Sequence, residues 1–80
     1  METEKETKYL RFIMRGKIDS DGVVSRVYSR RAGDLLGSID WYDPWGCYEF
    51  NSLENIEFSS GCLREIADYL DELMAMREKK

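Results

Sequence analysis

The 80-residue sequence contains no histidine, a single proline and no long run of apolar residues. Histidine is the commonest general base near neutral pH and the commonest metal ligand, so its absence argues against acid–base catalysis and against a metal site. The glycine patterns of nucleotide-binding loops and the Gly-x-Ser-x-Gly turn of serine hydrolases are also missing. We therefore expect a protein that is not an enzyme and that requires no cofactor or metal ion.

Cysteine is also scarce, because Cys47 and Cys62 are the only two in the sequence. The opening segment METEKETK is charged where a signal peptide would be apolar, and no segment reaches the roughly 20 apolar residues of a membrane span. We therefore expect a cytoplasmic protein without membrane association, whose two thiols stay free in a reducing compartment. The two cysteines also lack the Cys-x-x-Cys spacing of a typical metal site.

The composition is that of a small globular protein, with 42% hydrophobic and 35% charged residues. A chain of this length provides for one hydrophobic core. We therefore expect a single domain over residues 1–80, with a disordered tail at 1–7, a sheet at 8–58 and a helix at 60–78.

Alternation of apolar and polar residues predicts four β-strands between residues 8 and 58, separated by turn-forming segments such as 19–22 and 43–46. Ile56 and Phe58 also alternate, so their segment is expected to form either a short fifth strand or a loop. The residues expected on the covered face of the sheet are Leu10, Phe12, Met14, Val23, Val27, Leu35, Gly37, Ile39, Trp41, Tyr48 and Phe50.

The segment after Ser59 and Ser60 repeats apolar residues at helical spacing, and serine is a favourable residue at a helix N-cap. Short loops favour the pairing of consecutive strands. The predicted fold is therefore α+β: an antiparallel β-meander of four strands, or five, with one C-terminal α-helix packed on one face. The apolar stripe expected to contact the sheet is Leu63, Ile66, Ala67, Leu70, Leu73 and Met74.

The net charge of −4 conceals an uneven distribution along the chain. Residues 8–33 hold seven basic and two acidic side chains, whereas residues 34–58 hold six acidic side chains and no basic one. Such asymmetry indicates surfaces of opposite sign. The uncovered sheet face is expected to carry both, through Arg11, Arg15, Arg26, Tyr28, Arg30, Asp40, Tyr42 and Glu49.

Two interpretations of this face remain open. Arginines beside an aromatic ring suit the phosphates and bases of a single strand. Alternatively, the arginines pair across the sheet with Asp40 and Glu49, each pair contributing about 0.2–1 kcal/mol. We favour the pairing, because acidic neighbours repel phosphate.

The segment Asp43-Pro44-Trp45-Gly46 fits a type I turn, with proline at its second position and glycine at its fourth. Trp45 occupies the third position and is expected to lie partly exposed. Tryptophan and tyrosine dominate the energetics of protein interfaces. The turn is therefore a candidate contact with a partner.

The hairpin reads Gly37-x-Ile39-x-Trp41-Tyr42-x-Pro44-Trp45-x-x-Tyr48-x-Phe50 and is followed by Cys62-Leu63-x-x-Ile66-Ala67-x-x-Leu70. This pattern resembles a group of small uncharacterised proteins of phages, prophages and bacterial genomes. The resemblance implies an origin in a mobile element and implies no activity. That group often has an arginine after the second tryptophan and a proline after the final phenylalanine, where this chain has Gly46 and Asn51.

These features lead to the hypothesis of a small non-enzymatic binding protein, derived from a phage or mobile element. It would dock on a host protein, for example one that handles nucleic acid, as an accessory or counter-defence (inhibitor) factor. The predicted partner-binding residues are Asp40, Tyr42, Asp43 and Trp45. The alternative is single-stranded nucleic-acid binding through Arg11, Arg26, Tyr28 and Arg30.

Overall fold

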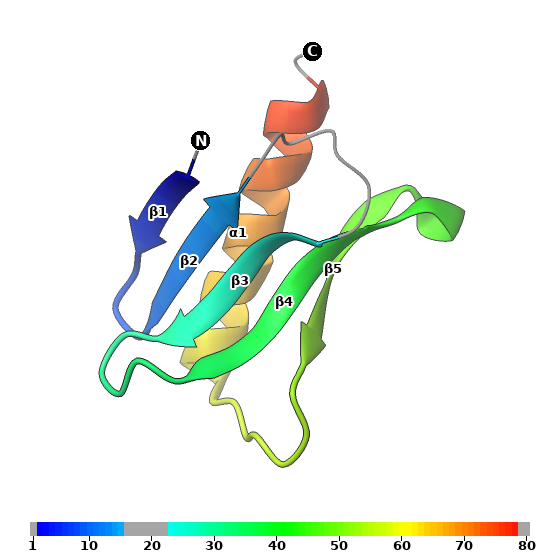
Figure 1. Ribbon diagram of the computed structural model, residues 1–80. Helices are drawn as coiled ribbons and strands as arrows, with labels where there is room; N and C mark the ends of the chain where they lie inside the picture. Colours follow the sequence, from blue (N-terminus) through cyan, green and yellow to red (C-terminus); the bar gives the residue numbers. More distant parts are fainter. Residues whose placement is uncertain (1, 16–22, 79–80) are drawn as a thin grey trace.

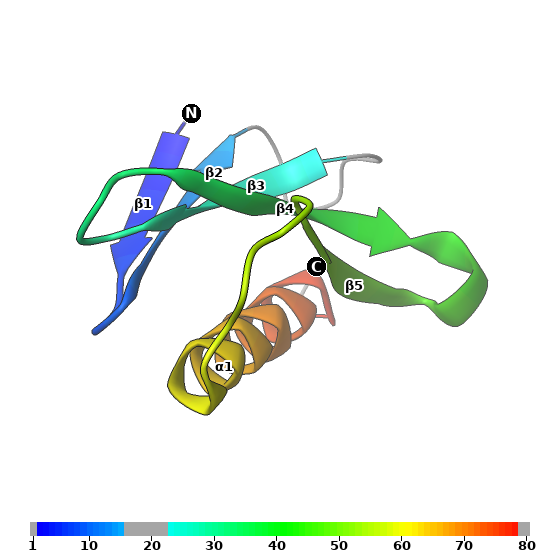
Figure 2. The same cartoon turned by 90° about the horizontal axis from the view of Figure 1, so that it is seen from below.

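The computed structural model describes residues 2–15 and 23–78, and the predicted turn at residues 19–22 lies outside these ranges. In the described chain each strand pairs with the next in one antiparallel sheet, and one α-helix crosses a single face of that sheet (Figures 1 and 2). The predicted α+β meander with a C-terminal helix is confirmed. The elements are β1 (Glu2–Glu6), β2 (Leu10–Arg15), β3 (Val23–Ser29), β4 (Leu35–Tyr42), the 3-10 turn η1 (Asp43–Trp45), β5 (Cys47–Ser52) and α1 (Ser60–Glu78).

The N-terminal segment was predicted to be a disordered tail, and this is wrong for Glu2–Glu6, which form β1 at the edge of the sheet. Polar contacts attach this end of the chain to the helix. Lys5 forms an ion pair with Glu72, and the hydroxyl group of Thr7 donates to the carboxylate of Glu65. A strand without apolar side chains has no hydrophobic periodicity, so the sequence pattern could not reveal it.

Of the two alternatives for residues 56–58, a short strand or a loop, the structure shows the loop, because these residues connect β5 to α1 without regular structure. Phe58 nevertheless packs edge-on against Phe50, with the ring centroids 5.4 Å apart. The apolar spacing of this segment therefore reflects its attachment to the core and not strand pairing.

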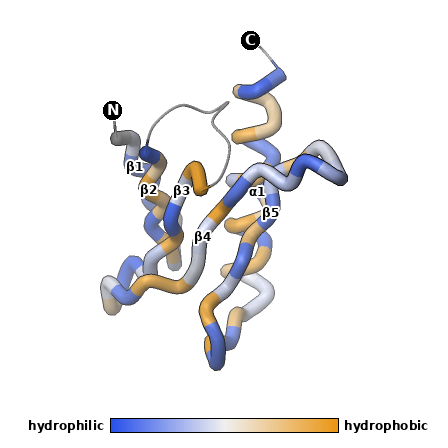
Figure 3. Tube along the Cα trace, turned by 45° about the vertical axis from the view of Figure 1, so that its right-hand side comes forward, coloured by the Kyte–Doolittle hydropathy of each residue, from blue (hydrophilic) through white to orange (hydrophobic). Residues whose placement is uncertain are grey.

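The core lies between α1 and the face of the sheet that α1 covers. Hydrophobic and hydrophilic residues both occur along the sheet and the helix (Figure 3), and the predicted inward row Leu10, Phe12 and Met14 of β2 is buried. The ring of Phe12 stacks on the ring of Tyr69, with centroids 4.1 Å apart. The buried hydrophobic residues are Leu10, Phe12, Met14, Val24, Val27, Ile39, Tyr48, Ile66, Tyr69 and Leu73.

A buried pair of hydroxyl groups crosses the interface between sheet and helix. Ser25 is 2% exposed, and its hydroxyl donates to the backbone carbonyl of Ile13 at 3.0 Å. The same oxygen lies 3.1 Å from the hydroxyl of Tyr69. A serine has one hydroxyl proton, so Tyr69 is the donor in this second bond. Burial raises the pKa of Tyr69 above its ordinary value, and the bond to Ser25 opposes this effect only in part.

A β-bulge in β3 shifts the alternation at the start of that strand. The Cα partners pass from Val23 and Asp40 to Ser25 and Ile39, which leaves Val24 as the extra residue. Val24 is consequently 1% exposed, whereas Val23 is 46% exposed. The prediction of Val23 on the covered face is therefore wrong, because strict alternation assumes an unbroken strand.

A second bulge, in β4, has the same effect. Val27 pairs with Gly37 and Tyr28 pairs with Leu35, so Leu36 is the extra residue. Leu36 packs against the core, while Leu35 is 37% exposed. The prediction of Leu35 on the covered face is wrong for the same reason.

Gly37 lies beside this second bulge and permits a close approach of β5. A β-carbon at Gly37 would stand 2.4 Å from the carbonyl oxygen of Asn51 and 2.8 Å from the ring of Phe50. A glycine inside a strand typically marks a bulge or a close approach of another segment. Here the bulge is present, and the element that approaches is β5.

The helix begins where two serines predicted it, with the Ser59 hydroxyl accepting from the backbone N–H of Cys62 at 3.2 Å. The predicted apolar stripe is wrong at Leu63 and Ala67, which are exposed, and it omitted Tyr69, which is buried. Tyr69 is buried although it is partly polar, because its side chain reaches from α1 to the sheet and its hydroxyl forms a hydrogen bond with Ser25 there.

Candidate functional site

The turn between β4 and β5 presents an exposed aromatic pair. Gly46 adopts a left-handed conformation, and its N–H donates to the carbonyl of Asp43 at 3.1 Å. Trp45 is 78% exposed, and its ring meets the ring of Tyr42 edge-on, with centroids 5.3 Å apart. We call Tyr42, Asp43 and Trp45 the aromatic turn. The backbone agrees with the predicted turn, and Trp45 lies in solvent as expected.

Acidic side chains lie within the aromatic turn and beside it. The carboxylate of Asp43 accepts from the indole N–H of Trp41 at 3.2 Å, and that of Asp40 accepts from the side-chain amide of Asn51 at 2.9 Å. Asp40 also lies directly across from Glu49 in the paired strands. The residues predicted to bind a partner therefore share one end of the hairpin: Asp40, Tyr42, Asp43 and Trp45.

The opposite face of the hairpin is attached to the helix. Trp41 packs edge-on against Tyr48, with centroids 5.1 Å apart, and the guanidinium of Arg77 lies 3.7 Å from the centre of the Trp41 ring. Arg77 also donates to the hydroxyl of Tyr48 at 3.3 Å. These contacts fix the base of the aromatic turn. The role of Arg77 was missed, because a lone arginine in the last helical turns looks like an ordinary solvated residue.

The arginines of the open sheet face pair with β1. The Nε of Arg11 lies 3.1 Å from a carboxylate oxygen of Glu4, and Arg11 also lies 3.6 Å from Glu6. Arg30 lies 3.5 Å from the same Glu6 carboxylate and donates to the carbonyl of Thr7 at 3.0 Å. Charge compensation across the sheet therefore occurs, as favoured from the sequence.

The expected partners of these arginines were wrong. Asp40 and Glu49 lie on β4 and β5, while the acids that pair with Arg11 come from β1, the strand that the sequence did not reveal. The register places three of the alternative nucleic-acid residues on one face, with Arg11 opposite Tyr28 and Arg26 opposite Ile13. Two of these four, Arg11 and Arg30, carry acidic partners.

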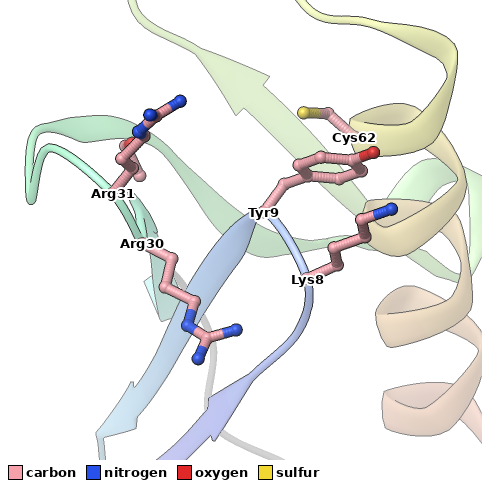
Figure 4. Close-up of a pocket in the computed structure, with 6 residues that line it drawn as sticks. Lys8, Tyr9, Arg30, Arg31 and Cys62 are labelled. Carbon is pink, nitrogen blue, oxygen red and sulfur yellow. The ribbon is translucent and has the colours of Figure 1, made fainter.

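A pocket at the far end of β4 from the aromatic turn was not found from the sequence. It is an open pocket with a volume of about 560 Å³, and three separate segments of the chain line it (Figure 4). These segments, at residues 8–9, 29–31 and 62, are distant from one another in sequence, so no sequence motif indicates the pocket. The lining residues are Lys8, Tyr9, Ser29, Arg30, Arg31 and Cys62.

Cys47 and Cys62 are both free thiols. Within residues 2–15 and 23–78, no three potential ligands are grouped closely enough to hold a metal ion. The helix in this part of the chain is not apolar enough to cross a membrane.

The fold and its surfaces define a small α+β protein, built as a five-stranded meander under one helix, with an exposed aromatic turn and a basic pocket. A protein of Acholeplasma phage L2, described as "Uncharacterized 9.3 kDa protein", is 32% identical to it over 78 residues. The alignment covers 94% of this chain and 96% of the phage protein. The chain belongs to the family of this phage protein, which confirms the resemblance to small phage proteins.

No family model matches the chain. No solved structure gives a significant match either.

Proposed function

We propose that this protein is a non-enzymatic binding protein that docks on a host protein through the aromatic turn. The observation that carries the proposal is the exposure of Trp45, which leaves 78% of its surface in water. Tryptophan is among the residues most enriched at the energetic centres of interfaces. A partner that buries this ring gains free energy from removing its apolar surface from water.

The aromatic turn is pre-organised for such a contact. The edge-on packing of Trp45 on Tyr42 and the hydrogen bond between Asp43 and Trp41 restrain the turn before binding. Side chains that are already ordered lose less conformational entropy when they bind. Pre-organisation therefore favours this turn over the flexible charged side chains elsewhere on the surface.

The charge around the turn favours a basic partner surface. Residues 34–58 contain six acidic side chains and no basic one, and Asp40 and Glu49 lie side by side on the open face. Charge complementarity steers association and fixes orientation. A host protein with an apolar pocket inside a basic surface, such as a nucleic-acid-handling protein, fits best, and covering that surface would inhibit it.

The test compares Trp45→Ala with Leu53→Ala, which truncates another exposed apolar residue, 47% exposed and outside the turn. Host proteins captured from lysate are identified by mass spectrometry, and the affinity of the purified candidate is then measured for each variant. We expect Trp45→Ala to weaken binding by about 30-fold or more, since residues at interface centres contribute at least about 2 kcal/mol.

Leu53→Ala is expected to bind as the unmodified protein does, and circular dichroism should show both variants folded. Asp43→Lys reverses the charge beside the Trp45 ring, so it should also weaken binding to a basic partner. This loss of affinity should be larger at low salt than at high salt, because salt screens the interaction between exposed charges. Equal affinities for Trp45→Ala and the unmodified protein would exclude the aromatic turn as the docking surface.

A further inference from the structure

The basic pocket is separate from the aromatic turn. It lies where β2 begins and β3 ends, beside the first turn of α1, whereas the aromatic turn joins the other end of β4 to β5 (Figure 1). A ligand in the pocket therefore leaves the aromatic turn uncovered.

The lining of the pocket is strongly cationic. Lys8, Arg30 and Arg31 line it, and none of its lining residues is acidic. Arg30 is already engaged by Glu6 and Thr7, and its guanidinium turns away from the opening in Figure 4. In the described ranges 2–15 and 23–78, no ion pair involves Lys8 or Arg31. These two charges remain available to an anion.

An aromatic ring forms one wall beside these charges. Tyr9 is 43% exposed, and the ammonium of Lys8 lies 5.3 Å from the centre of its ring. Figure 4 shows the Tyr9 ring between Lys8 and the thiol of Cys62, with Arg31 across the opening. The pocket therefore combines positive charge with a flat apolar surface.

The walls are held in place by the backbone. The N–H of Arg30 donates to the carbonyl of Tyr9 at 3.1 Å, which joins β2 to the β3–β4 turn. Within that turn, Ser29 accepts from Gly33 at 2.8 Å through its carbonyl and from Ala32 at 3.2 Å through its hydroxyl. Because the pocket is formed before binding, little free energy is lost in ordering its walls when a ligand binds.

The helix also fixes the position of the aromatic wall. A β-carbon at Gly61 would stand 2.8 Å from the Tyr9 ring, so glycine allows the ring to rest against the first turn of α1. The N–H of Tyr9 donates to the Glu65 carboxylate at 3.2 Å. The backbone of Tyr9 is thus attached to the helix, and Tyr9 lines the pocket.

We propose that this pocket binds a nucleotide, with Arg31 and Lys8 on its phosphate groups and its base against the ring of Tyr9. Arginine forms bidentate charge-assisted hydrogen bonds with phosphate, and lysine adds a point charge. Bases stack on exposed aromatic rings without regard to sequence. A volume of about 560 Å³ is in the range of small-ligand pockets and larger than inorganic phosphate requires. This mode needs no glycine-rich loop.

Calorimetric titration of the full chain in metal-free, low-salt buffer tests the proposal, with ATP, inorganic pyrophosphate and adenosine as probes. We expect ATP to bind most tightly, pyrophosphate more weakly and adenosine most weakly, because only ATP uses both the charges and the ring. Absence of ATP binding would overturn the site. Equal affinities for ATP and pyrophosphate would overturn the assignment to a nucleotide.

Arg31→Gln tests which cations are used, and Arg26→Gln provides the same change of charge on the open sheet face, outside the pocket. Loss of one charge-assisted contact should weaken ATP binding about tenfold or more in Arg31→Gln. Arg26→Gln should bind as the unmodified protein does. Equal weakening in both variants would show a general effect of charge and overturn the pocket.

The two cysteines supply an independent readout. Cys62 lines the pocket, whereas Cys47 lies at the start of β5. With the single-thiol variants Cys47→Ser and Cys62→Ser, alkylation by neutral iodoacetamide can be followed by mass spectrometry. ATP should slow the alkylation of Cys62 and leave that of Cys47 unchanged. Unchanged alkylation of Cys62 at saturating ATP would place the nucleotide elsewhere and overturn the proposal.

Discussion

Removing the hydroxyl of Ser25 is expected to destabilise the protein more than removing the hydroxyl of Tyr69, although the two groups share one hydrogen bond. Tyr69 donates to Ser25, and Ser25 donates onward to the carbonyl of Ile13. Both residues are buried, with Ser25 2% and Tyr69 6% exposed. Removing either hydroxyl therefore leaves a different polar group without its partner.

Tyr69→Phe removes the donor and keeps the ring stacked on Phe12, while Ser25 keeps its bond to Ile13. Its expected cost is that of one hydrogen bond, about 0.5–1.5 kcal/mol. Ser25→Ala instead leaves the Tyr69 hydroxyl buried without its acceptor, which costs about 1–3 kcal/mol. Adding Tyr69→Phe to Ser25→Ala removes that unsatisfied donor, so the double variant should be more stable than Ser25→Ala alone.

The four proteins of this cycle can be compared by urea unfolding, followed by circular dichroism and tryptophan fluorescence, with the free energy extrapolated to water. The diagnostic result is a change of sign: Tyr69→Phe destabilises the unmodified protein and stabilises the Ser25→Ala variant. If Tyr69→Phe costs the same in both backgrounds, the two hydroxyls do not depend on each other and the reasoning fails.

The same pair gives a pH dependence. The pKa of Tyr69 in the folded protein is raised above the ordinary value of 10.0, mainly by burial. As pH rises through 10, the unfolded chain releases this proton while the folded protein retains it, so stability falls. The stabilising contribution is complete below pH 10 and is lost as pH approaches the folded pKa. Tyr69→Phe should therefore lose less stability at alkaline pH than the unmodified protein, and equal slopes would contradict this cause.

Two further substitutions test the hairpin formed by β4 and β5. Gly37→Ala places a methyl group 2.4 Å from the carbonyl oxygen of Asn51, so β5 must move. We expect the free energy of unfolding in urea to fall by about 1–3 kcal/mol, and an unchanged midpoint would refute the close approach. Arg77→Gln removes the cation from the ring of Trp41. We expect the free energy of unfolding to fall by about 0.5–1 kcal/mol, with faster amide hydrogen exchange in the last turns of α1. Unchanged exchange would show that the stacking does not hold the helix.

The periodicity of apolar residues in the sequence was enough to predict the strands and the helix that contribute apolar side chains to the core. The inward row of β2 follows from a spacing of two residues, and the presence of α1 follows from a spacing of three to four residues, with its start indicated by two serines. The two bulges lay beyond this reasoning, because an extra residue changes which side chain faces inward without changing the composition of the strand. Val24 and Leu36 are as apolar as the neighbours that they replace on the covered face.

The candidate sites divide in a similar way. The exposure of Trp45 was expected from its place at the third position of a four-residue turn. The ion pairs of Arg11 and the lining of the basic pocket depend on which strands are neighbours, so they required the fold. β1 mattered most here, because its acids pair with Arg11, whose partners the sequence placed on β4 and β5.

The order of elements along the chain has a consequence for biosynthesis. Every strand pairs with a neighbour in sequence, so the whole sheet can assemble as soon as β5 has been made. Its apolar face, however, finds its cover only in α1, which is synthesised after all five strands. A ribosome-bound chain therefore exposes Phe12 and Ile39 to other molecules until the helix emerges, and it is in this interval that aggregation or chaperone binding is most favoured.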